Sequence, residues 1–241
     1  MLLLLVVIVV FLVYGICTRR SLGDDRLSIA CLVICNESQP RWKIEKELWR
    51  QTRVPKNVDV YILDCNDKNN DLHCVENMAP GIYQKSLQGF KTAVHKKYDL
   101  YIRTNANTHV DFDTINKMWD PLKQKIKSSK PFFTGGIVFR WGASGTSIVL
   151  NHSAASELVN RGFDHKYYYA KYPDDVAISN VLKDSGIATT RNDGFKLYIW
   201  DPKKDFLIND TMRAVRKSPF VRIRNVSLSD ERRIRHHLSN K

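Results

Sequence analysis

"YIRTNANTHVDFDTI", residues 101–115, combines the end of a predicted strand, an Asn-rich turn and the start of a helix. The strand is predicted over 99–105, where apolar and aromatic residues form a short run typical of a buried strand. The turn follows at Asn105 and Asn107, and a helix is predicted over 111–126. A strand that passes through a polar turn into a helix is the repeating unit of α/β sheets.

The same alternation extends outward in both directions along the chain. Further strands are predicted at 28–35, 58–65, 132–139, 145–151, 187–192 and 195–200, and further helices at 41–52, 82–98, 153–163 and 172–186. The run at 28–35 is continuously apolar, as in strands buried on both faces. We therefore expect an α/β fold of Rossmann-like type, with a mainly parallel sheet covered by helices on both faces.

Polar residues close several of these predicted strands. Asp64 ends the second strand, and Asn105 and Asn107 follow the third. In open sheets of this kind ligands bind at the carboxyl ends of the strands. These three residues are therefore expected to line one crevice.

The N-terminal end differs from the rest of the chain. Residues 2–17 are uncharged and almost wholly apolar; as a helix they would span roughly 24 Å, which a thin bilayer tolerates. We predict an uncleaved membrane anchor over 1–18, with a cleaved signal peptide as the alternative. A linker at 19–27, a domain at 28–225 and a basic C-terminal helix at 226–241 would follow.

The side of the membrane stays open on sequence grounds. Arg19 and Arg20 follow the apolar segment and favour a cytosolic domain. Four glycosylation sequons would suit a lumenal domain instead; they begin at Asn36, Asn151, Asn209 and Asn225. Cys65 and Cys74 bracket a polar loop and either pair in an oxidising lumen or remain buried thiols.

The formal net charge is +13, and much of it lies near the C-terminus. From position 211 onward there are nine Lys or Arg residues against Asp230 and Glu231. Basic tails bind nucleic acid, anionic lipids or phosphorylated ligands, and many are simply solvated. No nucleic-acid-reading module is recognisable, so nucleic acid is not expected as a partner.

Four segments and a closing stretch occur in an order that resembles a known family. They are NMAPGIYQKSLQGF (77–90), YDLYIRTNANTHV (98–110), TGGIVFRWGASGTSIVLNHSAASELV (134–159), YPDDVAISNVLKDSGI (172–187) and SPFVRIRNVSLSDERRIRHHL (218–238). Together they resemble fringe-like or family-31-like glycosyltransferases of the GT-A fold, and especially the small glycosyltransferases of large DNA viruses. The resemblance covers about residues 28–235.

The resemblance implies transfer of a sugar, with inversion, from a nucleotide-diphosphate donor to a hydroxyl acceptor. It favours a UDP-sugar as donor, a glycan or glycoprotein as acceptor, and a single-pass location in a Golgi, ER or virus-infected host membrane. A catalytically inactive carbohydrate-binding or scaffold protein is the alternative. A membrane-tethered nucleic-acid-binding protein is a more distant one.

The resemblance also assigns roles to individual residues. Asp175 in Tyr-Pro-Asp-Asp-Val matches the family's catalytic base, whereas Asp174 is either a second candidate or a helix cap. Residues implied on the donor side are Asp64, Lys85, Arg103, Asn105, Asn107, Arg222 and Arg224. Residues implied on the acceptor side are Trp141, Gly142, Ser144 and Gly145, with Trp141 either a stacking platform or core.

The chain departs from the family where a metal-binding Asp-x-Asp is expected. Asn105-Ala106-Asn107 stands there, and amides bring no charge to Mn²⁺ or Mg²⁺. No metal ligand is assigned, and transfer with weak or no metal dependence is expected, with Arg222 and Arg224 neutralising the diphosphate. The residues that would restore a metal site are Asp111, Asp113, His109, His236 and His237; Asp113 is otherwise expected to cap the helix that follows.

Overall fold

The computed structural model describes residues 26–36, 41–64, 79–139, 142–190, 197–200, 218–223 and 228–239. The predicted anchor at 1–18, Trp141, Arg224 and the Cys65 and Cys74 pair lie outside these ranges. Across the described ranges, no helix is both long and apolar enough to cross a membrane.

The centre of the molecule is a five-stranded sheet in the order β2-β1-β3-β8-β5. Its strands are β1 (Ile29–Ile34), β2 (Val58–Leu63), β3 (Leu100–Asn105), β5 (Phe133–Gly135) and β8 (Ser147–Asn151). β1 pairs in parallel with β2 and β3, while β8 runs antiparallel between β3 and β5. The predicted α/β fold with a mainly parallel sheet is thus confirmed.

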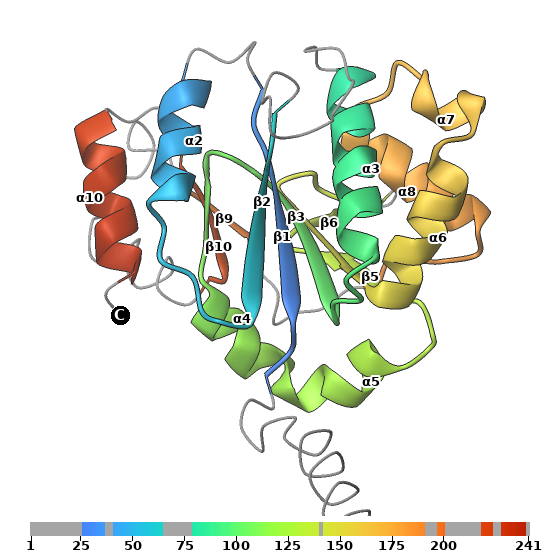
Figure 1. Ribbon diagram of the computed structural model, residues 1–241, viewed down its shortest axis with the longest axis horizontal. Coiled ribbons are helices and arrows are strands. Elements are labelled where there is room, and N and C mark those ends of the chain that lie inside the picture. The colour runs from blue at the N-terminus through green and yellow to red at the C-terminus, as the bar shows by residue number, and fades with distance from the viewer. Residues whose placement is uncertain are drawn as a thin grey trace, which may run out of the picture.

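Helices cover both faces of this sheet (Figure 1). One face carries α3 (Gly81–Val94), α6 (His152–Gly162) and α8 (Asp174–Asp184), and the other carries α2 (Trp42–Arg50) and α4 (Phe112–Trp119). Side chains alternate along a strand, so Leu32 of β1 packs in the first core and Val33 in the second. This explains why residues 28–35 are continuously apolar.

A smaller sheet and a hairpin adjoin the central sheet. The smaller sheet has the order β4-β10-β9, with β4 (Thr108–Val110), β10 (Phe220–Ile223) and β9 (Leu197–Trp200). β6 (Val138–Phe139) and β7 (Gly142–Ala143) form the hairpin. The remaining elements are a 3-10 turn (Asp120–Leu122), α5 (Lys123–Lys127), α7 (His165–Tyr168) and α10 (Leu228–Ser239).

Some local predictions are wrong, for identifiable reasons. The helix expected over 111–126 is divided at Asp120–Leu122 because Pro121 cannot continue an α-helix. The cap of its first part is Asp111, whose carboxylate accepts from the Thr114 N–H at 2.9 Å, and not Asp113. Residues 187–190 of the strand expected at 187–192 form no strand, although Thr190 N–H donates to the Phe133 carbonyl at 2.7 Å.

Two of the sequons have buried asparagines. Asn151 is fully buried; its side-chain oxygen caps α6 at Ala154 N–H, and its amide donates to the Lys130 carbonyl at 2.9 Å. Asn36 is 7% exposed. A glycan cannot be attached to Asn151 in this fold, so that sequon does not indicate the side of the membrane.

Candidate functional site

The register of the sheet brings the predicted site residues to one edge. Ile34 of β1 stands between Leu63 of β2 and Asn105 of β3, so these strands end level. Thr104 faces Ser147, the first residue of the antiparallel β8, so the turn before β8 reaches the same edge. Asp64, Asn105 and the turn at 144–146 therefore lie along the carboxyl edge of the parallel strands.

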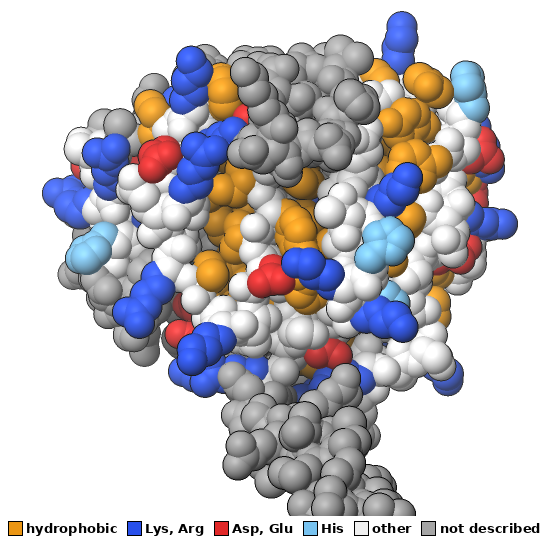
Figure 2. Space-filling model, viewed as in Figure 1, with side chains coloured by type: hydrophobic (Ala, Val, Ile, Leu, Met, Phe, Trp, Pro, Cys, Tyr) orange, Lys and Arg blue, Asp and Glu red, His pale blue; other side chains and the backbone are white. Residues whose placement is uncertain are grey.

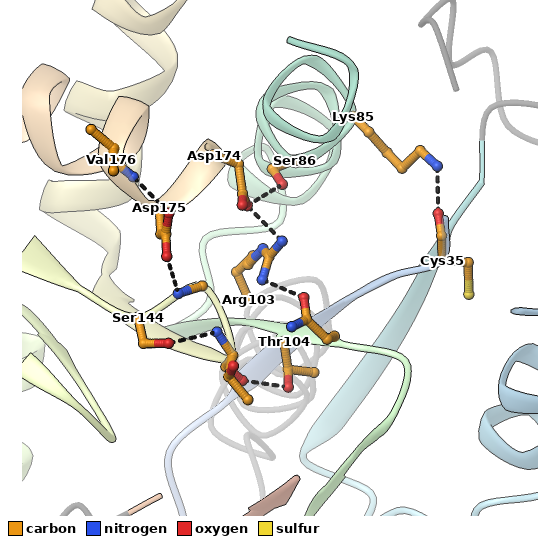
Figure 3. A network of polar contacts seen from close by, with 12 residues as sticks. Cys35, Lys85, Ser86, Arg103, Thr104, Ser144, Asp174, Asp175 and Val176 are labelled. Carbon is orange, nitrogen blue, oxygen red and sulfur yellow. Dashed lines mark hydrogen bonds and ion pairs between the residues drawn. The ribbon is translucent and has the colours of Figure 1, made fainter. Parts of the chain in front are cut away.

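Arg103 is the central residue of this edge (Figure 3). It comes from β3, is 1% exposed, and points from the sheet toward α3 and α8. Its Nη2 lies 2.6 Å from Oδ2 of Asp174, and its Nη1 donates to Oδ1 of Asn105 at 2.7 Å. One buried guanidinium thus joins the strand end to the start of α8.

Asp174 is the first residue of α8 and is 7% exposed. The N-cap position of α8 is Pro173, and the Asp174 carboxylate has partners on neighbouring elements: Oδ2 is paired with Arg103 and accepts from the Ser86 hydroxyl of α3 at 3.3 Å. Burial raises the pKa of Asp174, although the Arg103 charge acts in the opposite direction. The carboxylate is therefore committed to an internal ion pair that links three elements.

Asp175, the next residue, is held differently. It is half-buried; its Oδ2 accepts from the Gly145 N–H and its Oδ1 from the Val176 N–H, each at 3.0 Å. These two contacts fix the carboxylate between the turn before β8 and the first turn of α8. A carboxylate oxygen accepts more than one hydrogen bond, so both oxygens keep acceptor capacity for a ligand.

The small residues of the turn are required by close packing. A Cβ on Gly145 would lie 3.0 Å from Nη1 of Arg103 and 3.3 Å from Oδ1 of Asp174. Gly142 has φ +151°, and its Cβ would lie 1.8 Å from the Ser179 hydroxyl of α8. Ser144 closes the turn by accepting from Ser147 N–H at 3.0 Å. Glycine therefore lets this turn approach both the Arg103–Asp174 pair and α8.

The Asn105-Ala106-Asn107 turn is fixed through its backbone. The Ala106 carbonyl accepts from Nε1 of Trp49 and from Nη2 of Arg235, both at 2.8 Å. Oδ1 of Asn107 is buried and has no hydrogen-bond partner among the described residues. The turn is thus held from α2 and α10, and Asn107 presents an unused acceptor.

The basic C-terminal helix is not simply a solvated face. Arg235 is 7% exposed and pairs at 2.9 Å with Glu231, which is fully buried and also pairs with Arg41. Burial lowers the pKa of Arg235. Since Arg235 also holds Ala106, α10 is part of the support of the candidate site.

Arg222 reaches the site from β10. Its Nη1 donates to the Thr146 hydroxyl at 3.3 Å, and the Thr146 carbonyl accepts from the Thr104 hydroxyl at 2.7 Å. Two hydrogen bonds therefore connect Arg222 through Thr146 to Thr104, the residue that follows Arg103 in β3. Arg224, its predicted companion, lies outside the described residues.

The other two donor-side candidates lie further along the same edge. Asp64 is 1% exposed and pairs with Lys46 of α2 at 2.7 Å. Lys85 is 1% exposed and donates to the Cys35 carbonyl at the end of β1. The structure brings Arg103, Asn105, Asp174 and Asp175 into one contact network, and places Asp64 and Lys85 beside it.

Two polar groups at this edge that could contribute to a divalent metal site are already paired with Arg103. The buried Asp174 carboxylate already faces the Arg103 cation, and Asn105 offers its oxygen to the same guanidinium. In the described part of the chain, no three His, Cys, Asp or Glu residues are grouped so as to hold a metal. A metal ion bound to the Asp174 carboxylate would be repelled by the Arg103 guanidinium, whose Nη2 lies 2.6 Å from Oδ2 of Asp174.

Sequence reasoning missed the supporting residues Ser86, Thr146 and Trp49. Arg103 was predicted only as a donor-side residue through the family resemblance, yet an arginine within an otherwise apolar strand is itself a signal. Charged groups are almost never fully buried without a partner. That rule predicts a buried carboxylate facing Arg103, and Asp174 is this carboxylate.

A comparison with protein-family models and with curated proteins finds no match to this chain. The evidence for a function is therefore the geometry of the residues at the carboxyl edge of the sheet, together with the resemblance in the order of the motifs.

Proposed function

We propose that the protein is a glycosyltransferase that moves a sugar from a nucleotide-diphosphate donor to a hydroxyl acceptor with inversion. The observation that carries the proposal is the division between two adjacent aspartates. Asp174 is buried in an ion pair, whereas Asp175 is half-buried, oriented by two backbone N–H groups, and located at the carboxyl edge of the sheet. One carboxylate supports the site and the other remains for a ligand.

The proposed chemistry needs one proton acceptor and positive charge near the leaving group. The acceptor oxygen forms a bond to the anomeric carbon of the donor as the bond from that carbon to the diphosphate oxygen breaks. Asp175 takes the proton of the acceptor hydroxyl.

Arginines supply the positive charge in this proposal. Arg222 is connected to the edge through Thr146. Arg224, two positions further along the sequence, is assigned to the same charge. Guanidinium groups bind phosphate oxygens bidentately and remain charged. Asn107, with its buried unused oxygen, and Asn105 are assigned to ribose hydroxyl or phosphate contacts.

The test begins with a screen of nucleotide sugars by thermal shift and by donor hydrolysis, with manganese and with a chelator. Asp175→Asn should lower turnover by about two orders of magnitude or more, as expected for a positioned general base. Asp113→Asn is the matched control, because Asp113 is also in the first turn of a helix but is exposed on α4. Wild-type turnover in Asp175→Asn would remove the proposed base.

A catalytically inactive carbohydrate-binding protein is the second candidate, favoured by the absence of carboxylates at Asn105-Ala106-Asn107. The two candidates differ in one result. A protein that binds a nucleotide sugar or glycan but neither hydrolyses nor transfers the donor, under all conditions of the screen, would be the inactive form.

The N-terminal segment is assigned a role as membrane anchor. The sixteen uncharged and almost wholly apolar residues at 2–17 carry this assignment. Extraction of membranes with alkaline carbonate should leave the full chain in the pellet, and should release a chain lacking residues 1–18.

A further inference from the structure

The large exposed apolar side chains of the described residues are concentrated in one short segment. They are Phe163 (38% exposed), Tyr169 (58%) and Tyr172 (53%), all within ten residues. Figure 2 shows hydrophobic side chains gathered at the surface over α7, with basic side chains around them. Exposed apolar groups scattered singly need no explanation, but a cluster indicates a contact surface.

Three rings of this segment, those of Phe163, Tyr168 and Tyr169, pack against one another in turn. Phe163 and Tyr168 have ring centroids 5.4 Å apart, and Tyr168 and Tyr169 have centroids 5.2 Å apart in an edge-on arrangement. We call Phe163, Tyr168, Tyr169 and Tyr172 the aromatic surface. Lys91 lies 5.3 Å from the ring centre of Phe163, so a cation borders it.

The aromatic surface is held in a fixed position by the residues beneath it. Tyr167 is buried, and Asp164 caps α7 by accepting from Lys166 N–H at 3.1 Å. Two side chains of α3 hold Tyr168: Gln84 donates to its carbonyl at 3.1 Å and Gln88 to its hydroxyl at 3.0 Å. The exposed rings therefore do not serve to anchor the segment.

The same elements support the candidate active site. Ser86, two residues from Gln84 on α3, donates to Asp174, and the exposed Tyr172 is only two residues before Asp174. The segment that bears the aromatic rings thus leads directly into α8, which begins with Asp174 and Asp175, and α3 contacts both. The segment and α8 pack in the core on the same face of the sheet.

We propose that the aromatic surface binds sugar rings of an oligosaccharide acceptor and directs its terminal hydroxyl toward Asp175. Tyrosine presents a flat apolar face with a polar hydroxyl, which matches the alternating C–H and O–H groups of a sugar ring. Amphipathic helices that lie in a membrane interface carry Trp, Phe or Leu along one apolar face, whereas of these four rings only that of Tyr168 lies within a helix, the four-residue α7. The identification of this glycan as the acceptor rests on the proposed function.

The test measures binding and transfer separately. The full chain in detergent, displayed as a tetramer on streptavidin to gain avidity, is applied to a printed array of defined oligosaccharides two to six sugars long. Tyr169→Ala and Tyr172→Ala should each weaken binding by about two- to tenfold, as expected for loss of one aromatic contact. Tyr169→Phe keeps the ring and is the matched control, which should bind nearly as the wild type does.

Kinetics distinguish this proposal from the proposed function. The alanine variants should raise the KM for an array-positive oligosaccharide and leave donor hydrolysis unchanged. Array binding that depends on the rings, with no turnover of any donor, would keep the glycan surface and remove the proposed function. Absence of binding to every printed oligosaccharide would overturn the surface. The surface would also be overturned if both alanine variants bound the oligosaccharides as tightly as the wild type does. Ring-dependent binding to phosphatidylcholine–phosphatidylserine vesicles alone would overturn it as well.

Discussion

Replacement of Arg103 by methionine should separate the structural role of Asp174 from the catalytic role proposed for Asp175. Methionine fills much of the volume of the side chain but removes the cation, and leaves the Asp174 carboxylate buried without its counter-charge. The two groups are 2.6 Å apart, with side chains 2% and 10% exposed. Unit charges at that distance attract by about 6 kcal/mol at an effective dielectric constant of about 20.

The expected loss is smaller than this attraction, because the wild-type pair also carries the cost of burying two charges. Removing one partner of a buried ion pair costs about 3–5 kcal/mol. With a urea dependence of roughly 2.5 kcal/mol per molar, the unfolding midpoint should fall by about 1–2 M. Equilibrium urea unfolding followed by far-UV circular dichroism measures this shift.

The effect has a definite sign with pH. Burial already raises the pKa of Asp174, and loss of Arg103 should raise it further. The folded variant then holds a proton that the unfolded chain releases at about pH 4, so its free energy of unfolding should fall as pH rises above about 4. Part of the stability that Arg103→Met loses at pH 7 should therefore return as the pH is lowered to 5.

Two further variants test whether the loss of stability comes from the unpaired Asp174 carboxylate. The double variant Arg103→Met with Asp174→Asn removes both charges and should recover much of the loss. Arg161→Met removes a pair with Glu157, 52% and 35% exposed, and should cost less than about 1 kcal/mol. If Arg103→Met unfolds at the wild-type midpoint, or if the double variant is no more stable than the single one, the ion pair does not support the site.

Two other predictions concern the metal and the turn. Transfer should persist in a chelator without a steep dependence on manganese. Arg222→Ala should weaken nucleotide-diphosphate binding by about 1.5–3 kcal/mol in calorimetry, the scale of a charged hydrogen bond. Loss of transfer in the chelator, restored by manganese, would refute the view that arginines replace the metal. Gly142→Ala should lose about 2–4 kcal/mol of stability, because the new Cβ would lie 1.8 Å from the Ser179 hydroxyl. Gly186→Ala, at φ +76° with nothing within 4 Å, should lose only about 1 kcal/mol; equal losses would mean that backbone strain, and not the contact with α8, requires glycine.

The fold was predictable because its signals are local. The continuous apolar run that became β1, and the apolar stripe that became α3, each specify an element without reference to distant residues. The segment at 187–192 shows the limit of this reasoning. Its β-branched residues favour a strand, but among the described residues Thr190 meets the sheet through isolated bonds to Phe133 and Thr134.

The site was predictable only in outline. Strand ends can be read from the chain, and the sheet register then places Asp64 and Asn105 at one edge. The partner of Arg103 could not be identified in the same way, because Asp174 is far along the chain and meets it only when α8 packs against α3 and β7. Likewise, nothing local marks the Ala106 carbonyl as the point where α2 and α10 hold the turn.

The amide at position 105 and the arginine at position 103 form one arrangement of charge. Arg103 and Asp174 together are neutral, and Asn105 accepts a hydrogen bond from the guanidinium without adding charge. A carboxylate at position 105 would leave this buried edge with one excess negative charge, which is the condition that attracts a divalent cation. With an amide there, the pair needs no further cation, and the half-buried Asp175 is the carboxylate of this network that remains for a ligand. We infer that the positive charge for a departing diphosphate must then come from outside the pair, which is the position that Arg222 occupies beside Thr146.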